Sequence, residues 1–348
     1  MIRLGNDYGC GALPQVMDSL LALNKKGLAG YGLDEVTEKA RATILKLAQL
    51  NAGNVFFLTG GTQTNIVALD WLLRPGEGVL CSAEAHINVH EAGAIEACAH
   101  KVIPIDGSGG KISADSVRKY AERFYADPTW PHIVAPGAVY ITQPTETGAL
   151  YSLAEIRDFR DVCDEFDMRL YVDGARLIYA LGSPENDVSL PDLGHLTDAF
   201  YIGGTKCGTL FGEALVIPGR RSLREEQRIF SLIKRHGALL AKGWSVAAQF
   251  ESLMADSLYL SVGRSAVERA LRLRHLLENG GVKSAWLSPT NQQFFCVPTA
   301  ILDTLARQLA FDLWGAPGDE WSVIRLVTDW NTSDDDIEEA AGIILSKY

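Results

Sequence analysis

The sequence lacks the patterns that mark several large functional classes. It contains no apolar run of about 18 residues, the length that a membrane-spanning helix needs. Residues 1–7 do not form the apolar stretch of a signal peptide. The six cysteines include no Cys-x-x-Cys pair, and a chain of 348 residues needs no disulfide to fold. We therefore expect a protein of the reducing cytoplasm without a membrane partner.

Positive charge is also scarce. Lysine and arginine together number 32 against 43 aspartates and glutamates, which gives a formal net charge of −11. An acidic chain repels phosphate backbones, so we expect no nucleic-acid partner. Any phosphate that this protein binds must be small and held by a local group of donors.

Two nucleotide-binding signatures are missing. The glycine-rich turn Gly60-Gly61-Thr62-Gln63-Thr64-Asn65 is followed by no Gly-Lys-Ser/Thr, so it is not a P-loop. It also lacks the Gly-x-Gly-x-x-Gly fingerprint of dinucleotide-binding folds, which counts against a nicotinamide-dependent oxidoreductase.

What the chain does contain is a regular alternation of short apolar runs and longer amphipathic segments. Such alternation predicts an α/β fold with a mostly parallel seven-stranded sheet flanked by helices. The predicted strands are 55–58, 79–82, 102–105, 138–142, 170–172, 199–202 and 214–217. The predicted helices around them are 34–50, 63–73, 89–98, 114–126 and 153–166.

After residue 219 the pattern changes to charged helical sequence, followed by apolar runs at 294–297 and 323–328 and helices at 301–309 and from 333. This change predicts a smaller α+β domain at the carboxyl terminus. We expect an N-terminal segment (1–50), a large α/β domain (51–245) and a small domain (246–348).

The ends of the predicted strands carry the residues with chemical potential, because ligands of open α/β sheets bind at the carboxyl ends of strands. Gly60, Gly61 and Thr62 follow the first strand and open a helix, whose free N–H groups suit a phosphate. His86 follows the second strand, and it can serve as a stacking face, a proton carrier or a structural histidine. With His90 it has helical metal-ligand spacing, but no third ligand stands near, so we expect no metal.

Two further strand ends carry charged residues. Asp173 and Arg176 follow the fifth strand, where they can form a local turn and ion pair or face a ligand. Lys206 lies between glycines after the sixth strand, and burial there would lower its pKa and produce a nucleophilic amine. A phosphate cradle, a stacking ring, a carboxylate and a lysine at one sheet edge match pyridoxal phosphate, which presents a phosphate, an aromatic ring, a basic nitrogen and an aldehyde.

These segments resemble the threonine aldolase/β-eliminating lyase family of fold-type I pyridoxal-phosphate enzymes, and most closely its low-specificity L-threonine aldolase branch. The resemblance rests on Asn6-Asp7, Tyr31-Gly32-Leu33-Asp34, the turn at 60–65, Glu84-Ala85-His86, Glu91-Ala92-Gly93-Ala94, Asp173-Gly174-Ala175-Arg176, Gly203-Gly204-Thr205-Lys206, Arg325 and Trp330-Asn331-Thr332. It implies that the protein cleaves L-threonine or L-allo-threonine to glycine and an aldehyde.

The resemblance also implies roles for the cofactor-binding residues. Lys206 would hold the cofactor as a Schiff base, and Asp173 would keep the ring nitrogen protonated. Arg176 would lie near the ring hydroxyl and His86 would stack on the ring. Phosphate would bind at Gly60, Gly61 and Thr62.

Substrate binding is expected at Asn6, Tyr31, Arg176 and Arg325, with the planar fork of Arg325 gripping the substrate carboxylate. Many family members have serine where this chain has Asn6, and a histidine in the segment where this chain has Glu146. The base that takes the substrate hydroxyl proton is therefore left open between His86, Glu146 and a water molecule.

In this family the site forms between subunits of a homodimer, usually within a homotetramer. Tyr31, and Lys234 or Lys242, would then reach the cofactor of a neighbouring subunit. Three alternatives stay open: a β-eliminating lyase with the same Lys206 and Asp173, an amino-acid racemase, and a non-catalytic module that binds the cofactor without turnover.

Overall fold

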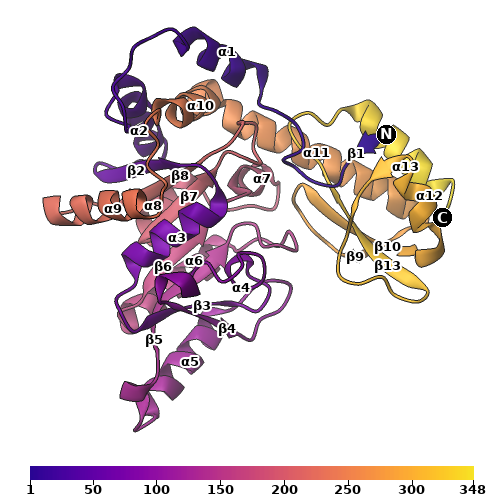
Figure 1. Ribbon diagram of the computed structural model, residues 1–348. Coiled ribbons are helices and arrows are strands. Elements are labelled where there is room, and N and C mark those ends of the chain that lie inside the picture. Colours follow the sequence, from indigo (N-terminus) through magenta and orange to yellow (C-terminus); the bar gives the residue numbers. More distant parts are fainter.

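The computed structural model describes residues 1–348 and contains the predicted seven-stranded sheet (Figure 1). The strands are β2 (Gly53–Leu58), β3 (Glu77–Ser82), β4 (Lys101–Ile105), β5 (Ala135–Thr142), β6 (Arg169–Asp173), β7 (Ala199–Gly203) and β8 (Glu213–Pro218). Their order across the sheet is β2-β8-β7-β6-β5-β3-β4. Only β8 runs antiparallel to its neighbours, so all seven predicted strands exist and the sheet is mostly parallel.

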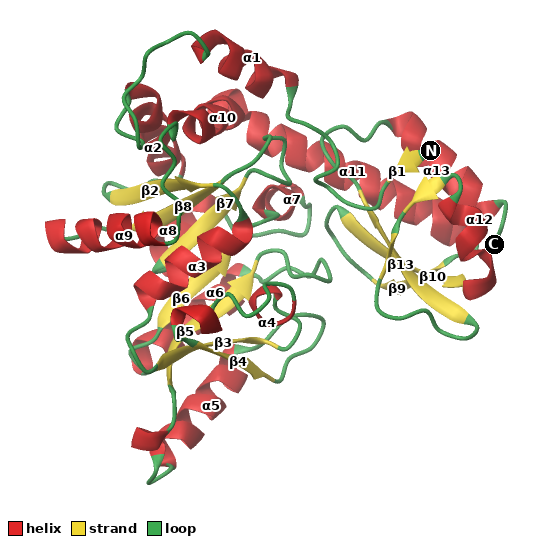
Figure 2. Cartoon of the chain, in the orientation of Figure 1, coloured by secondary structure: helices red, strands yellow, loops and turns green.

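Helices cover both faces of this sheet (Figure 2). One face packs against α3 (Gly61–Leu72) and α9 (Leu223–Arg235), and the other against α2 (Glu35–Leu47), α5 (Ala114–Ala126), α6 (Leu153–Glu165), α7 (Leu177–Gly182), α8 (Leu190–Leu196) and α10 (Trp244–Met254). Burial on both faces explains why the strands are almost continuously apolar. Helix α1 (Pro14–Leu23), which the sequence analysis did not predict, packs on α10.

The carboxyl-terminal part forms a second, antiparallel sheet in the order β12-β13-β10-β9. Its strands are β9 (Lys283–Trp286), β10 (Gln292–Pro298), β12 (Asp312–Leu313) and β13 (Trp321–Val327). Helices α11 (Leu258–Asn279) and α13 (Asp334–Leu345) cover it, and α12 (Leu302–Ala306) leads into β11 (Leu309–Ala310). The first strand of the chain, β1 (Ile2–Arg3), pairs with β11, so the amino terminus lies beside the carboxyl-terminal sheet.

The division into three parts stays a prediction, and the apolar cores show how these parts are connected. Ile2 and Leu4 belong to the apolar core of the carboxyl-terminal sheet. Helix α11 contributes Val262 to the core of the large sheet and Leu273 to that of the small one. The two cores are therefore joined through one continuous helix.

Two helix predictions were wrong. The segment 89–98 is not one helix but α4 (His86–Val89) and a 3₁₀ turn (Glu96–Cys98). Between them Ala92 and Gly93 have φ of 53° and 73°, a left-handed conformation that a right-handed helix does not allow. The predicted helix 301–309 is likewise shorter, because its last residues turn into β11.

No helix in the structure combines the length and the apolar character that crossing a bilayer requires.

The crossing of α7 and α11 gives a test of the packing. A Cβ added at Gly263 of α11 would lie 2.2 Å from the carbonyl oxygen of Ile178 in α7. We expect Gly263→Ala to lower the free energy of unfolding by about 1–3 kcal/mol, because the helices must move apart. Gly342→Ala in α13 is the matched control, since its Cβ meets no atom within 4 Å and alanine favours the helix by about 1 kcal/mol. Urea unfolding of the two variants should move in opposite directions; equal shifts would contradict this account of the crossing.

Candidate active site

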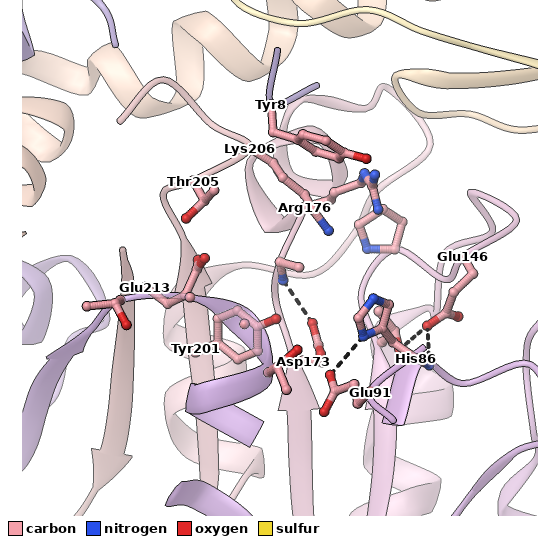
Figure 3. A pocket seen from close by; sticks show the side chains of 17 residues that line it. Tyr8, His86, Glu91, Glu146, Asp173, Arg176, Tyr201, Thr205, Lys206 and Glu213 are labelled. Atoms are coloured by element: carbon pink, nitrogen blue, oxygen red, sulfur yellow. Dashed lines mark hydrogen bonds and ion pairs between the residues drawn. The ribbon is translucent and has the colours of Figure 1, made fainter. Parts of the chain in front are cut away.

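A cavity of about 300 Å³ opens at the carboxyl ends of the parallel strands (Figure 3). Most of its lining side chains are polar or charged. Eight residues singled out from the sequence line it: Gly60, Gly61, Thr62, His86, Glu146, Asp173, Arg176 and Lys206. The structure therefore brings together residues from five segments that are up to 146 positions apart in the sequence.

Three predicted substrate-binding residues do not line this cavity. Tyr31 lies 45% exposed in a separate hollow with Phe56 and Phe230. Asn6 accepts a hydrogen bond from the backbone N–H of Tyr8 at 3.1 Å, and it is Tyr8 that faces the cavity. Arg325 lies on β13 of the small sheet.

The guanidinium of Arg325 has its own partners. It donates to the side-chain oxygen of Gln292 at 3.0 Å and to the carboxylate of Asp312. Burial and then the charges of His86 and Arg325 lower the pKa of His90, whose ring centre lies 5.5 Å from that of His86. In this arrangement Arg325 is held by residues of the small sheet and not by the cavity.

The amino terminus of α3 forms one wall. Its N-cap, Gly60, offers no side-chain hydrogen bond, and the N–H groups of Gly61, Thr62 and Gln63 have no acceptor within the chain. A Cβ at Gly60 would meet nothing within 4 Å, so the space beside these donors is open. Free N–H groups and the positive end of the helix dipole make this wall an anion cradle.

Asp173, the last residue of β6, forms the floor. Its side chain is buried and accepts hydrogen bonds from the hydroxyl of Tyr140 at 2.6 Å, Nδ2 of Asn65 at 3.0 Å and the backbone N–H of Ala175 at 2.9 Å. These three donors replace the water that the buried carboxylate has lost. No cationic side chain pairs with it, so a cationic group of a ligand would complete the site.

Lys206 follows β7 and reaches the cavity from the opposite side to Asp173 (Figure 3). Its amine makes no hydrogen bond or ion pair within the chain. Burial and then the nearby charge of Arg176 lower the pKa of Lys206, while Asp7, Asp173 and Glu213 act in the opposite direction. The net effect is a larger share of neutral, nucleophilic amine than an exposed lysine has.

Arg176 is fixed by a carboxylate that the sequence analysis gave no role. Asp7 accepts from Nε of Arg176 at 2.7 Å and from Nη2 at 3.0 Å, and the side chain of Asp7 is fully buried. Burial raises the pKa of Asp7, but Arg176 and Lys206 outweigh it, so the pKa is lowered overall. Asn291 of the small sheet adds a third donor to Asp7 at 3.0 Å.

Two glutamates of the site carry no counter-charge. Burial raises the pKa of Glu146 to about 7, and its Oε1 accepts from the backbone N–H of His86 at 2.9 Å and from the hydroxyl of Thr142 at 3.2 Å. The other oxygen of Glu146 is buried without a partner. Burial likewise raises the pKa of Glu213 to about 7, and this carboxylate accepts from the backbone N–H of Gly204 at 2.9 Å.

His86 is tied to a further buried acid. Its Nδ1 lies 2.8 Å from Oε1 of Glu91, which also accepts from Nδ2 of Asn65 at 2.8 Å. The same Nδ2 donates to Asp173. Hydrogen bonds therefore run from His86 to the cavity floor.

Sequence reasoning missed several of these residues. Glu213 begins a strand, and only the reversed direction of β8 brings it to the edge where the other strands end. Tyr140 lies inside a run that was assigned only to the apolar core. Asn65 and Glu91 stand in the motifs quoted for the resemblance, but no role was assigned to them. Asn65 could have been found as a polar residue on the otherwise mostly apolar buried face of α3.

Comparisons with known proteins show which proteins this chain is similar to. A family model described as beta-eliminating lyase matches residues 9–279. The chain is 27% identical to a low specificity L-threonine aldolase of Pseudomonas sp. (strain NCIMB 10558), over 98% of this chain and 96% of that protein.

Solved structures extend the likeness. A threonine aldolase structure from Leishmania major matches with a TM-score of 0.94 and 36% identity, covering 99% of this chain and 98% of that one. Aspartate aminotransferase from Thermus thermophilus matches with a TM-score of 0.70 at 15% identity, over 99% of this chain and 91% of that one, a likeness of fold alone. The predicted fold class, fold-type I, is thereby confirmed.

Proposed function

Because the chain belongs to the beta-eliminating lyase family, whose members use pyridoxal phosphate, we propose that it cleaves β-hydroxy-α-amino acids such as L-threonine and L-allo-threonine to glycine and an aldehyde. The observation that carries the proposal is the free amine of Lys206 facing the donor-held carboxylate of Asp173 across one cavity. Aldolases of this name among the relatives support the substrate class.

The residues present fit pyridoxal phosphate. The uncapped start of α3 suits a phosphate, since its N–H groups have no other acceptor. Asp173 lacks a cation of its own and suits a protonated ring nitrogen, and Lys206 supplies the amine that would hold the aldehyde carbon. When bound, the cofactor provides an electrophilic carbon for amines and a ring that accepts the electron pair of the broken Cα–Cβ bond.

The chain's own groups have separate tasks in the cleavage. Lys206 offers a partly neutral amine because burial and Arg176 lower its pKa. Asp173 is held in place by its three donors and would face the ring nitrogen, where a carboxylate stabilises a proton. Arg176 is locked by Asp7, so its remaining N–H groups are fixed toward the cavity, where we assign them to the ring hydroxyl or the substrate carboxylate.

Arg325 and Asn6 keep their proposed place at the substrate. Arg325 would bind the substrate carboxylate after turning from the outer wall, where Asp312 and Gln292 now orient it. Asn6 would act from the segment that also supplies Tyr8.

Glu146 is our choice for the base. Its Oε1 is held by two donors while Oε2 is buried without a partner, and the residue lines the cavity. Its pKa of about 7 suits a group that takes a proton near neutral pH and returns it. His86, whose Nδ1 is engaged by Glu91, then serves as the stacking face.

We also propose that a second copy of the chain completes the site. Arg176 and Lys206 are the only arginine and lysine in the cavity lining, and both are assigned to other groups. This leaves the phosphate cradle without a basic side chain from its own chain. Tyr31 and Lys234 lie together outside the cavity, with the lysine amine 5.4 Å from the ring centre. In a homodimer or homotetramer they, or Lys242, would reach a neighbour's cofactor.

A cytoplasmic location is a further proposal. All six cysteines are free in the structure, and Cys81, Cys163 and Cys207 are buried. Free thiols in this number are typical of a reducing compartment.

The first test is spectroscopic. Purified protein loaded with pyridoxal phosphate should show a visible absorbance band that Lys206→Ala abolishes, together with turnover. Addition of L-allo-threonine should yield glycine and an aldehyde in equal amounts. Pyruvate would instead indicate β-elimination, a D-amino acid would indicate racemisation, and an unchanged band without product would indicate a binding module.

The second test concerns the base. Because only the ionised form of Glu146 accepts a proton, kcat/KM for L-allo-threonine should fall as the pH drops below about 7. Glu146→Gln should lower kcat about 10²–10⁴-fold and remove this dependence. Glu96→Gln, at an exposed position of the same part of the fold, is the control. A pH profile that survives in Glu146→Gln would assign the base elsewhere.

The third test concerns the shared site. Lys206→Ala and Tyr31→Ala chains should each be inactive, but a mixture should regain about a quarter of wild-type activity, because each hybrid dimer contains one intact site. Lys206→Ala mixed with Asp173→Asn should regain nothing, since these residues line the same cavity of one chain. Equal recovery in both mixtures, or none in either, would rule out Tyr31 as a partner-site residue.

A further inference from the structure

Glu91 is a buried acid that the proposed mechanism does not use. Its side chain has no exposed surface, and no lysine or arginine pairs with it. It lies between the short helix α4, which ends at Val89, and the left-handed turn at Ala92 and Gly93. Burying a carboxyl group costs free energy unless hydrogen bonds or an opposite charge compensate for the lost water.

From these contacts we propose that Glu91 and Asn65 are positioning residues that hold His86 and Asp173 as one hydrogen-bonded unit. The unit fixes the imidazole that covers the cofactor ring relative to the carboxylate that binds its nitrogen. The inference rests on the proposed function only in requiring that the cavity holds pyridoxal phosphate.

The amide of Asn65 is the centre of this unit. Its two N–H bonds point to two different carboxylates, Glu91 at 2.8 Å and Asp173 at 3.0 Å. Its oxygen accepts from the hydroxyl of Tyr171 at 2.9 Å. The amide nitrogen thus faces two carboxyl oxygens, which accept, and the amide oxygen faces a hydroxyl, which can donate, so the contacts match the orientation of the amide. Without this amide, two buried acids would face one another unscreened.

His86 is held at two points. Nδ1 donates to Glu91, which leaves Nε2 without a partner in the chain and fixes the plane of the ring. The backbone N–H of His86 donates to Glu146 at 2.9 Å. A ring held in this way cannot rotate about its Cβ–Cγ bond without losing the bond to Glu91.

The experiment is a double-mutant cycle on cofactor binding. Apoenzymes of wild type, Glu91→Ala, His86→Phe and the double variant are titrated with pyridoxal phosphate, and the apparent Kd is read from the absorbance band. We expect Glu91→Ala to raise Kd about tenfold in the wild-type background and to have almost no effect in the His86→Phe background. Glu91→Gln keeps an acceptor for His86 and Asn65, so it should recover most of the affinity.

Three controls keep the result interpretable. Glu96→Gln should leave Kd unchanged. Thermal melting of the apoenzymes separates loss of fold from loss of positioning, and the Glu91→Gln and Asn65→Ala variants serve if Glu91→Ala does not fold. Asn65→Ala should reproduce the loss seen with Glu91→Ala.

The outcomes separate the two proposals. Equal fold-changes for Glu91→Ala with and without His86 would overturn the inference alone, as would an unchanged Kd in a protein that binds the cofactor. Wild-type protein that takes up no pyridoxal phosphate would overturn the proposed function and this inference together.

Discussion

An excess of buried acid at one sheet edge governs the chemistry of this site. Two basic side chains, Arg176 and Lys206, lie among five carboxyl groups: Asp7, Glu91, Glu146, Asp173 and Glu213. Ionising all five carboxyl groups at once would be too costly in a low-dielectric cavity. The donors and charges beside each group therefore decide how readily it loses its proton. Asp7 has Arg176 and a lowered pKa, whereas Glu146 and Glu213 have a pKa of about 7.

This imbalance selects what the cavity can hold. A surplus of negative charge around Asp173 favours a ligand whose ring nitrogen is protonated, and that is the form of pyridoxal phosphate that withdraws electrons best. The phosphate, which carries the same sign as the acids, has to lie away from them. The only wall built from donors alone is the start of α3. The cofactor orientation that we propose, with the phosphate at α3 and the ring nitrogen at Asp173, therefore agrees with the electrostatics of the cavity.

Much of the fold and of the candidate site could be predicted from the sequence because the sheet is mostly parallel. Continuous apolar runs identified all seven strands, and parallel strands bring their carboxyl ends to one edge, so Lys206, Asp173 and Gly61 had to come together. Residues whose role depends on long-range contacts escaped this reasoning. Glu213 enters through a strand that runs the other way. Arg325 was named only through the family resemblance, because it lies on the second sheet, whose position no local pattern specifies.

The way in which Arg176 is held shows that the site depends on both sheets. Asp7, its partner, follows a strand that pairs with β11, and the backbone N–H of Val327 in β13 donates to the carbonyl of Leu4 at 2.7 Å. Asn291 of the small unit completes the contacts of Asp7. A displacement of the small sheet would thus move Asp7, release Arg176 and change the charge beside Lys206. Because Arg325 is carried by the same sheet, the cation that we propose for the substrate carboxylate and the charged pair beside Lys206 both depend on the position of one structural element.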